Sequence, residues 1–291
     1  MSQFSHTKTL FHLPSNVVYL DGNSLGPMPL AAREHVATMM GNEWGEQMIK
    51  GWNNAGWMSL STQIGDRIAP LIGAEPGHVI MGDTLSIKVH QALAAALALN
   101  PGRKVILSDY GNFPSDLYMA QGLIKTLDRG HTLKTVAPED VSHHIDDQVA
   151  VLMLTEVDYR TGRKHDMQAL TATAHAHGVI TLWDLAHSVG ALPVDLVGSN
   201  VDFAVGCTYK YLNGGPGAPA FIYVCPAYVN KVDSSLSGWL GHAAPFDFEL
   251  DYRAAQGIER LRVGTPPVIA LKCLEPALDI WDLVTIDQVR K

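Results

Sequence analysis

The strongest constraint on the fold of this chain is a series of short apolar runs separated by segments with helical periodicity. Most of these runs are apolar throughout instead of alternating with polar residues, which is typical of strands that are buried on both faces of a parallel sheet. We therefore expect an α/β fold with a mostly parallel sheet flanked by helices. The expected strands are His78–Met81, Lys104–Leu107, Thr132–Val136, Val149–Thr155, Val179–Trp183, Phe203–Cys207 and Ala220–Val224.

Helical patterns precede the first of these runs, lie between several of them and occur again near the C-terminus. The first is loosened by Gly41 and Gly45, and the third is rich in alanine, a strong helix former. The expected helices cover residues 30–50, 57–72, 85–99, 114–127 and 166–177, with a further helical pattern at 285–291.

Composition limits the classes of function. Apolar residues make up 47% of the 291 residues, which is enough for a sizeable core, and the net charge of −8 disfavours nucleic acid as the main partner. The chain contains no apolar run of about 18 residues, so we expect no membrane span. Cys207, Cys225 and Cys273 are far apart and the N-terminus lacks an apolar signal stretch, which favours the cytoplasm. The histidine pairs lack a third ligand at helical spacing, so no metal site is expected.

Polar residues follow several of the expected strands, at the edge where ligands bind in such sheets. Asp184 ends one strand, and Lys210 follows the next. An acid and a lysine at successive strand ends suit pyridoxal phosphate, which forms a Schiff base with a lysine and needs a carboxylate to keep its pyridine nitrogen protonated. Asp184 is expected to be ionised, because a free aspartate titrates near ~3.9.

Other residues have types that suit the same cofactor. Phe113 offers an aromatic face to its ring, and Tyr209 offers a phenol to its phosphate. Leu85 and Ser86 open the helix at 85–99, where backbone N–H groups and a hydroxyl suit a phosphate.

Each of these residues also has a purely structural interpretation. Asp184 is equally suited to capping the turn that follows it, and a single loop lysine such as Lys210 is usually solvated. Phe113 precedes a proline and fits a core position as well as a cofactor contact. The glycine-rich stretch 214–217 matches neither common phosphate-binding pattern and is consistent with a tight loop.

Six motifs, in order along the chain from about residue 17 to the C-terminus, closely resemble the kynureninase family of the bacterial type. They are YLDGNSLG at 19–26, FPSD at 113–116, WDLAHS at 183–188, GCTYKYLNGGPG at 206–217, SGWLGH at 237–242 and GTPP at 264–267. The resemblance implies the aspartate-aminotransferase-like fold, fold type I. It divides the chain into an N-terminal segment at 1–30 and a pyridoxal-phosphate-binding large domain at 31–291.

The resemblance also assigns roles to individual residues. Lys210 matches the Schiff-base lysine, Asp184 matches the partner of the pyridine nitrogen, and His187 lies beside it. Tyr209 is expected to carry protons, and Ser24 matches a substrate contact. The other matched cofactor contacts are Leu85, Ser86, Phe113, Asp116 and Thr155, together with Trp239 and Thr265, which in the family reach the phosphate from the second subunit of a homodimer.

The implied reaction is hydrolysis of the Cβ–Cγ bond of L-kynurenine, or of its 3-hydroxy form, to anthranilate (or 3-hydroxyanthranilate) and L-alanine, in tryptophan catabolism and NAD biosynthesis. Lys88 and Glu156 depart from the residues usual in the family. The family also continues beyond Lys291 into a small domain with an arginine for the substrate carboxylate, so the resemblance implies a chain that lacks this domain and turns over poorly.

Two alternatives stay open at this point. One is a folded, cofactor-binding fragment with impaired catalysis. The other is a different enzyme of the same fold, such as a cysteine desulfurase or a small aminotransferase. A desulfurase needs an exposed nucleophilic cysteine on a mobile loop, whereas Cys207 and Cys225 lie in or next to apolar strands.

Overall fold

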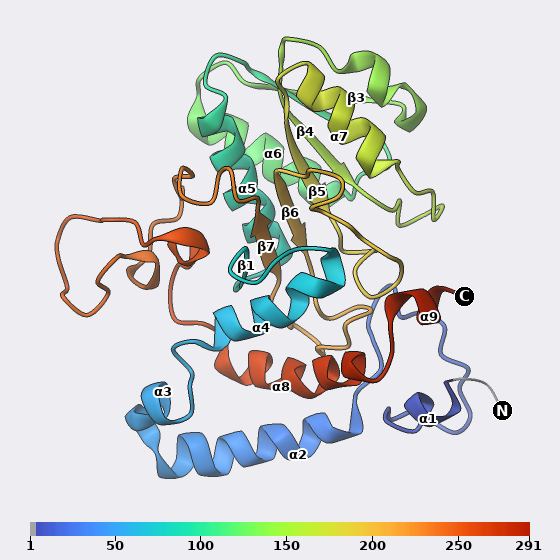
Figure 1. Cartoon of the computed structure of the whole chain (residues 1–291), viewed down its shortest axis with the longest axis vertical. Coiled ribbons are helices and arrows are strands. Elements are labelled where there is room, and N and C mark those ends of the chain that lie inside the picture. Colours follow the sequence, from blue (N-terminus) through green and yellow to red (C-terminus); the bar gives the residue numbers. More distant parts are fainter. Residues whose placement is uncertain (1–3) are drawn as a thin grey trace.

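The computed structural model describes residues 4–291, so the first three residues of the N-terminal segment lie outside it. A seven-stranded sheet crosses the molecule in the order β1-β7-β6-β5-β4-β2-β3 (Figure 1). Its strands are β1 (Val79–Met81), β2 (Val105–Asp109), β3 (Thr132–Val136), β4 (Val149–Thr155), β5 (Ile180–Asp184), β6 (Phe203–Gly206) and β7 (Phe221–Val224). All seven agree with the expected runs, with bounds that shift by up to two residues.

The sheet is mostly parallel, as expected, and β7 is the reversed strand within it. This strand pairs antiparallel with both β1 and β6, whereas the pairs among β2, β3, β4, β5 and β6 are all parallel. The reversal follows from the connection, because residues 207–220 return the chain directly from β6 to β7 without a crossover helix.

Helices cover both faces of the sheet. One face packs against α5 (Leu85–Leu99) and α6 (Pro114–Leu127), and the other packs against α4 (Leu60–Ile68), α7 (Met167–Ala176) and α8 (Val268–Asp279). Successive residues of β4 alternate between the two cores, with Val151 and Met153 in one and Leu152 and Leu154 in the other. This double burial explains why the strands read as continuous apolar runs.

The helix expected over residues 30–50 is wrong in its extent. Helix α2 (Leu30–Thr38) gives way to the π-helix η1 (Met39–Glu46), the 3-10 helix η2 (Met48–Lys50) and then α3 (Gly51–Asn54). Gly41 and Gly45 fall inside the π-helix, where their weak helical preference lets the turn widen. The helix expected at 57–72 is also divided, since α4 is followed by η3 (Ala69–Ile72), which contains Pro70.

The remaining elements are short. They are α1 (Ser5–Lys8), η4 (Pro138–His144), η5 (Trp239–Gly241), η6 (Gly257–Leu261), η7 (Ile280–Asp282) and α9 (Ile286–Arg290). Among residues 4–291, no helix combines the length and the apolar character that crossing a bilayer requires.

The contact between α4 and β1 depends on Gly65. A Cβ added there would collide with the backbone carbonyl of Val79, which cannot move without disturbing the sheet. Gly122, in the exposed middle of α6, has open space at the same position. We predict that Gly65→Ala lowers the unfolding temperature and that Gly122→Ala stabilises the fold by about 1 kcal/mol, because alanine is the better helix former. Thermal unfolding followed by circular dichroism tests the two variants. Equal shifts of their unfolding temperatures in the same direction would contradict this packing.

Candidate functional site

The carboxyl ends of three parallel strands lie side by side and place polar residues at one edge of the sheet. Thr155 at the end of β4 pairs with Asp184 at the end of β5, and Asp184 pairs with Val205 of β6. The chain then leaves β6 through Cys207 and reaches Lys210. The register therefore brings the acid and the lysine, which are distant in sequence, to the same edge.

Lys210 is almost buried, with only 7% of its surface exposed. Its Nζ lies 2.7 Å from His187 Nε2. The same nitrogen lies 5.8 Å from the ring centre of Phe113 and 5.7 Å from that of Tyr209. The solvated-lysine interpretation is therefore wrong, because this amine lies in a pocket of aromatic rings and one imidazole.

His187 is the neutral partner of this amine. Burial lowers the pKa of its imidazole to about 4, and the positive charge of Lys210 acts in the same direction. At neutral pH the ring accepts the Lys210 hydrogen bond at Nε2 and carries its proton on Nδ1, which is buried without a protein partner.

Asp184 is buried at the bottom of the site, with 3% of its surface exposed. Its Oδ1 accepts the backbone N–H of Ala186 at 2.9 Å. Burial raises the pKa of the carboxyl to about 6, while the Ala186 hydrogen bond and the charge of Lys210 oppose the rise, so the group stays ionised at neutral pH as expected. Within residues 4–291 its Oδ2 accepts no hydrogen bond from a nitrogen, and its side-chain neighbour is the carboxyl group of Asp116. A buried carboxylate of this kind fits a residue that receives the protonated ring nitrogen of pyridoxal phosphate.

Asp116 faces Asp184 from the first turn of α6. It is 1% exposed, and burial raises its pKa well above the ordinary value, with the negative charge of Asp184 acting in the same direction. Two adjacent buried carboxyl groups do not both ionise readily, so Asp116 is the member of the pair that keeps its proton.

The amino ends of α5 and α6 meet near Asp116, which lies in the first turn of α6. Ser86 Oγ lies 3.0 Å from Ser115 Oγ, which joins the first turns of the two helices. In α5 the N–H groups of Leu85 and Ser86 belong to the first turn, where no helical carbonyl accepts them. This end of a 15-residue helix suits a phosphate, as the sequence predicts.

The N-terminal segment closes one side of the site. The Gly26 N–H donates to the carbonyl of Tyr209 at 2.8 Å, and a side chain on Gly26 would collide with the Lys210 carbonyl. Ser24 is exposed near this contact, and its hydroxyl donates to Asp21 at 2.8 Å. The segment thus places Ser24 at the edge of the site and not inside it.

Sequence reasoning missed Tyr159. Its ring meets Phe113 edge-on at 5.1 Å between centres and lies nearly parallel to the His187 ring at 6.4 Å. The loop that carries it is fastened at its far end, where His165 Nε2 lies 2.5 Å from the buried carboxylate of Asp109. A single tyrosine in a polar loop carries no periodic signal, so only the folded structure reveals this contact.

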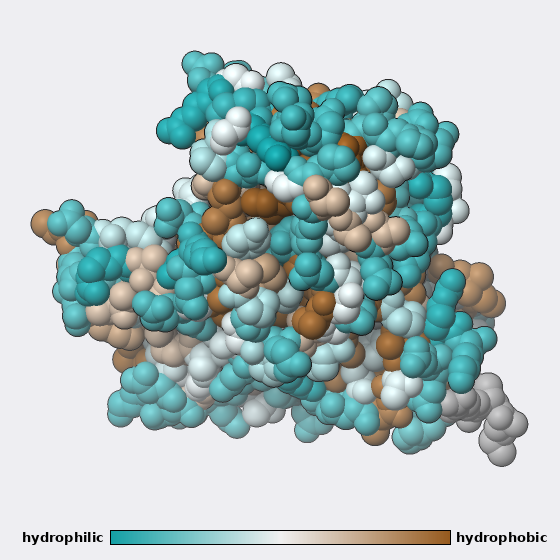
Figure 2. All heavy atoms as spheres, turned by 45° about the horizontal axis from the view of Figure 1, so that its top comes forward, coloured by the Kyte–Doolittle hydropathy of each residue, from teal (hydrophilic) through white to brown (hydrophobic). Residues whose placement is uncertain are grey.

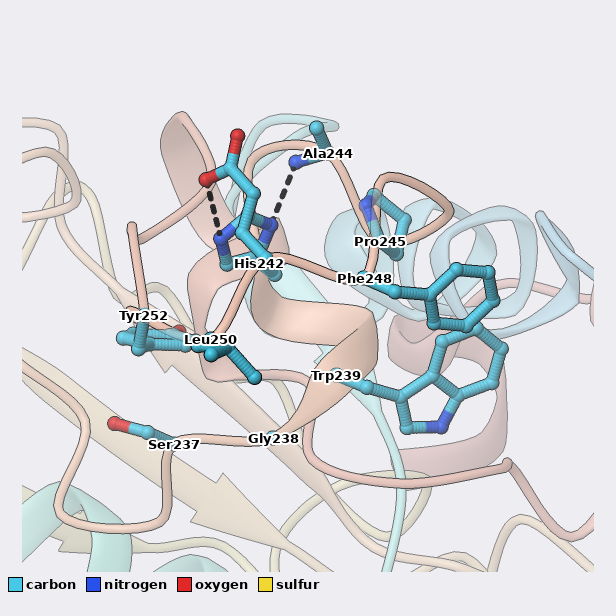
Figure 3. Close-up of a pocket in the computed structure, with 10 residues that line it drawn as sticks. Ser237, Gly238, Trp239, His242, Ala244, Pro245, Phe248, Leu250 and Tyr252 are labelled. Atoms are coloured by element: carbon cyan, nitrogen blue, oxygen red, sulfur yellow. Dashed lines mark hydrogen bonds and ion pairs between the residues drawn. The ribbon is translucent and has the colours of Figure 1, made fainter.

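Trp239 lines one pocket of the chain, and Thr265 lines a small cavity beside Gly82, Asp83 and Lys88. The Trp239 ring meets the Phe246 ring edge-on at 5.9 Å between centres. The pocket that Trp239 lines has a volume of about 320 Å³, and Figure 3 shows it together with Phe248, Leu250 and Tyr252. Its segment projects from the side of the molecule in orange in Figure 1, and Figure 2 shows apolar side chains at the outer end of this projection. Phe248 and Leu250 of this segment are highly exposed.

The cysteines do not resemble exposed nucleophiles. Cys207 is buried, and burial raises the pKa of its thiol to about 12, while Cys225 and Cys273 are partly buried. All three are unpaired. Because the thiolate is the nucleophile, the site does not support the desulfurase alternative.

Comparison with known proteins agrees with this geometry. The family described as aminotransferase class-V matches residues 52–291. The kynureninase of Deinococcus radiodurans is 47% identical over 99% of this chain and 71% of the relative. That of Pseudomonas fluorescens is 47% identical over 97% of this chain and 69% of the relative.

Solved structures show the same fold at much lower identity. The cysteine desulfurase CsdA of Escherichia coli superposes with a TM-score of 0.82 at 18% identity, over 99% of this chain and 74% of that one. The lyase C-DES, in a mutant with glycine linked covalently to its pyridoxal phosphate, gives 0.84 at 18% identity over 95% of this chain and 74% of its own. These matches confirm fold type I, and at this identity they carry no information on the substrate.

Proposed function

The chain belongs to the kynureninase family, and we propose that it hydrolyses the Cβ–Cγ bond of L-kynurenine, or of the 3-hydroxy form, to an anthranilate and L-alanine. It is a pyridoxal-phosphate enzyme, and its relatives at 47% identity bear the name of this activity. The observation that carries the proposal is the convergence of Lys210, Asp184 and Phe113 at one edge of the sheet.

When bound, pyridoxal phosphate supplies an electron sink for the carbanions that this cleavage requires. The protein residues hold and move protons around it. In our proposal the carboxylate of Asp184 holds the proton of the ring nitrogen, and the face of Phe113 supports the ring. The α5 amino end and Tyr209 bind the phosphate, with Thr155 and Asp116 as further contacts.

Lys210 is the proposed base for the α-proton of the substrate. Its Nζ is within hydrogen-bond distance of the neutral His187, whose Nε2 accepts a hydrogen bond from the amine and so orients it for its role as base. Burial raises the pKa of the Tyr209 phenol, which keeps this group protonated as a donor. Ser24 and His187 are proposed to orient the aminophenyl ketone at the open edge.

We also propose a homodimer with shared active sites. Support comes from the projecting segment with exposed Phe248 and Leu250, because a surface of this kind is typical of a protein interface. As the family resemblance implies, we assign Trp239 and Thr265 to the phosphate of the partner copy. Trp239 lies on the projecting segment, and Thr265 lines the cavity beside Gly82 and Lys88 of its own chain. The three unpaired cysteines support a cytoplasmic location.

The first test concerns Lys210. Borohydride treatment of the protein with pyridoxal phosphate should fix the cofactor covalently, and Lys210→Ala should abolish this label because the amine that forms the bond is lost. Lys272→Ala, which removes a buried lysine from an ion-pair network on α8, should keep it. The parent protein should release anthranilate from L-kynurenine, and Lys210→Ala should not. A retained label in Lys210→Ala, or turnover of L-cysteine instead of L-kynurenine, would overturn the assignment.

The second test concerns the shared sites. Lys210→Ala and Trp239→Ala should each be inactive as homodimers, the second because it removes a phosphate contact from both sites. Co-expression with two different tags gives mixed dimers in which one site keeps both residues. The mixed dimers should therefore recover anthranilate release. Purified mixed dimers that stay inactive would show that Trp239 serves its own subunit.

A further inference from the structure

Lys88 is a buried lysine for which the proposed mechanism has no use. It lies in the second turn of α5 and is 1% exposed. Long helical side chains lean toward the amino end of their helix, so its ammonium reaches back beneath the turn that leads from β1 into α5. Its Nζ lies 3.6 Å from Asp83 Oδ2, and it would lie 3.8 Å from a Cβ on Gly82.

The ammonium also joins this turn to a distant segment. It donates to Gln91 Oε1 at 3.0 Å and to the carbonyl of Leu261 at 3.4 Å. The Gln91 amide donates to the same carbonyl at 3.0 Å. A cavity of about 20 Å³ remains between the two segments, lined by Gly82, Asp83, Lys88, Arg262, Thr265 and their neighbours.

The charge of Lys88 is only partly balanced within the chain. Burial lowers the pKa of its amine to about 8, and its carboxylate partner, Asp83, is 3.6 Å away and partly exposed. The other charged side chain of the cavity is Arg262, which has its own carboxylate partner in Glu259 at 2.9 Å. Lys272, in contrast, lies between Glu275 at 3.1 Å and Glu43 at 3.6 Å. A buried cation is costly when its carboxylate partner is 3.6 Å away and partly exposed, so the position of Lys88 suits an anion that binds nearby.

We propose that Lys88 is a positioning residue for the cofactor phosphate, with an ammonium that lies behind the 82–86 turn and stabilises a doubly negative group at the amino end of α5. The inference rests on the proposed function only for the assignment of the phosphate to this turn. The helix end supplies N–H groups at the front, and Lys88 supplies charge from behind. Its contacts to Gln91 and Leu261 keep the ammonium from moving into solvent.

The test compares two probes that differ only in the phosphate. Pyridoxal 5'-phosphate and pyridoxal both carry the aldehyde that reacts with Lys210, and their binding to the cofactor-free protein is measured by absorbance titration. Lys88→Met, which keeps the length without the charge, should weaken the affinity for pyridoxal phosphate about tenfold, which corresponds to about 1.4 kcal/mol. Its affinity for pyridoxal should stay at the parent value. Lys272→Met is the matched control and should change neither affinity.

The pH dependence provides a second readout. Lys88 is charged below a pKa of about 8 and neutral above it. The parent protein should therefore bind pyridoxal phosphate about tenfold more tightly than Lys88→Met at pH 7, and this difference in affinity should shrink as the pH rises past 8. If Lys88→Met weakens the affinity for both probes equally, the role of Lys88 is purely structural. If its affinity for pyridoxal phosphate is unchanged, Lys88 has no role in binding the phosphate. Failure of the parent protein to bind either probe would instead contradict the cofactor assignment itself.

Discussion

The parallel pairing of β4, β5 and β6 is the constraint on which the rest of the structure depends. The register of these strands is fixed by side chains buried on both faces, and a slip of one residue would exchange the two cores. It brings Thr155, Asp184 and the start of the Lys210 loop to one edge. The packing of apolar side chains on the two faces of the sheet therefore fixes the positions of these polar site residues.

The site groups are held in unfavourable electrostatic states. Burial raises the pKa values of Asp184 and Asp116 and lowers those of His187 and Lys88. Each of these pKa shifts reflects the free-energy cost of burying the charged form of the group. A ligand that brings a protonated ring nitrogen to Asp184 and a phosphate to α5 supplies the missing partners. We infer that cofactor binding and stability of this fold are closely coupled.

The sequence predicts the parts of the molecule that depend on periodicity or on a linear motif. The strands were expected from their continuous apolar runs, and Asp184 and Lys210 from their places after two of them. The direction of β7 was not predictable from its own residues, because it is set by the connection from β6. The π-helix at Met39–Glu46 was visible only as a weakened helical pattern. The ring of Tyr159 and the burial of Lys88 depend on contacts between distant segments, for which a single sequence has no signal.

The central claim is that Asp184 holds the proton of the cofactor ring nitrogen beside Lys210. The most direct measurement is the nitrogen-15 chemical shift of pyridoxal phosphate labelled at the ring nitrogen and bound to the protein. We predict a protonated nitrogen in the parent protein and an unprotonated one in Asp184→Asn, which is nearly isosteric and lacks the charge. A ring nitrogen that is protonated in both proteins, or in neither, would contradict this account of the site.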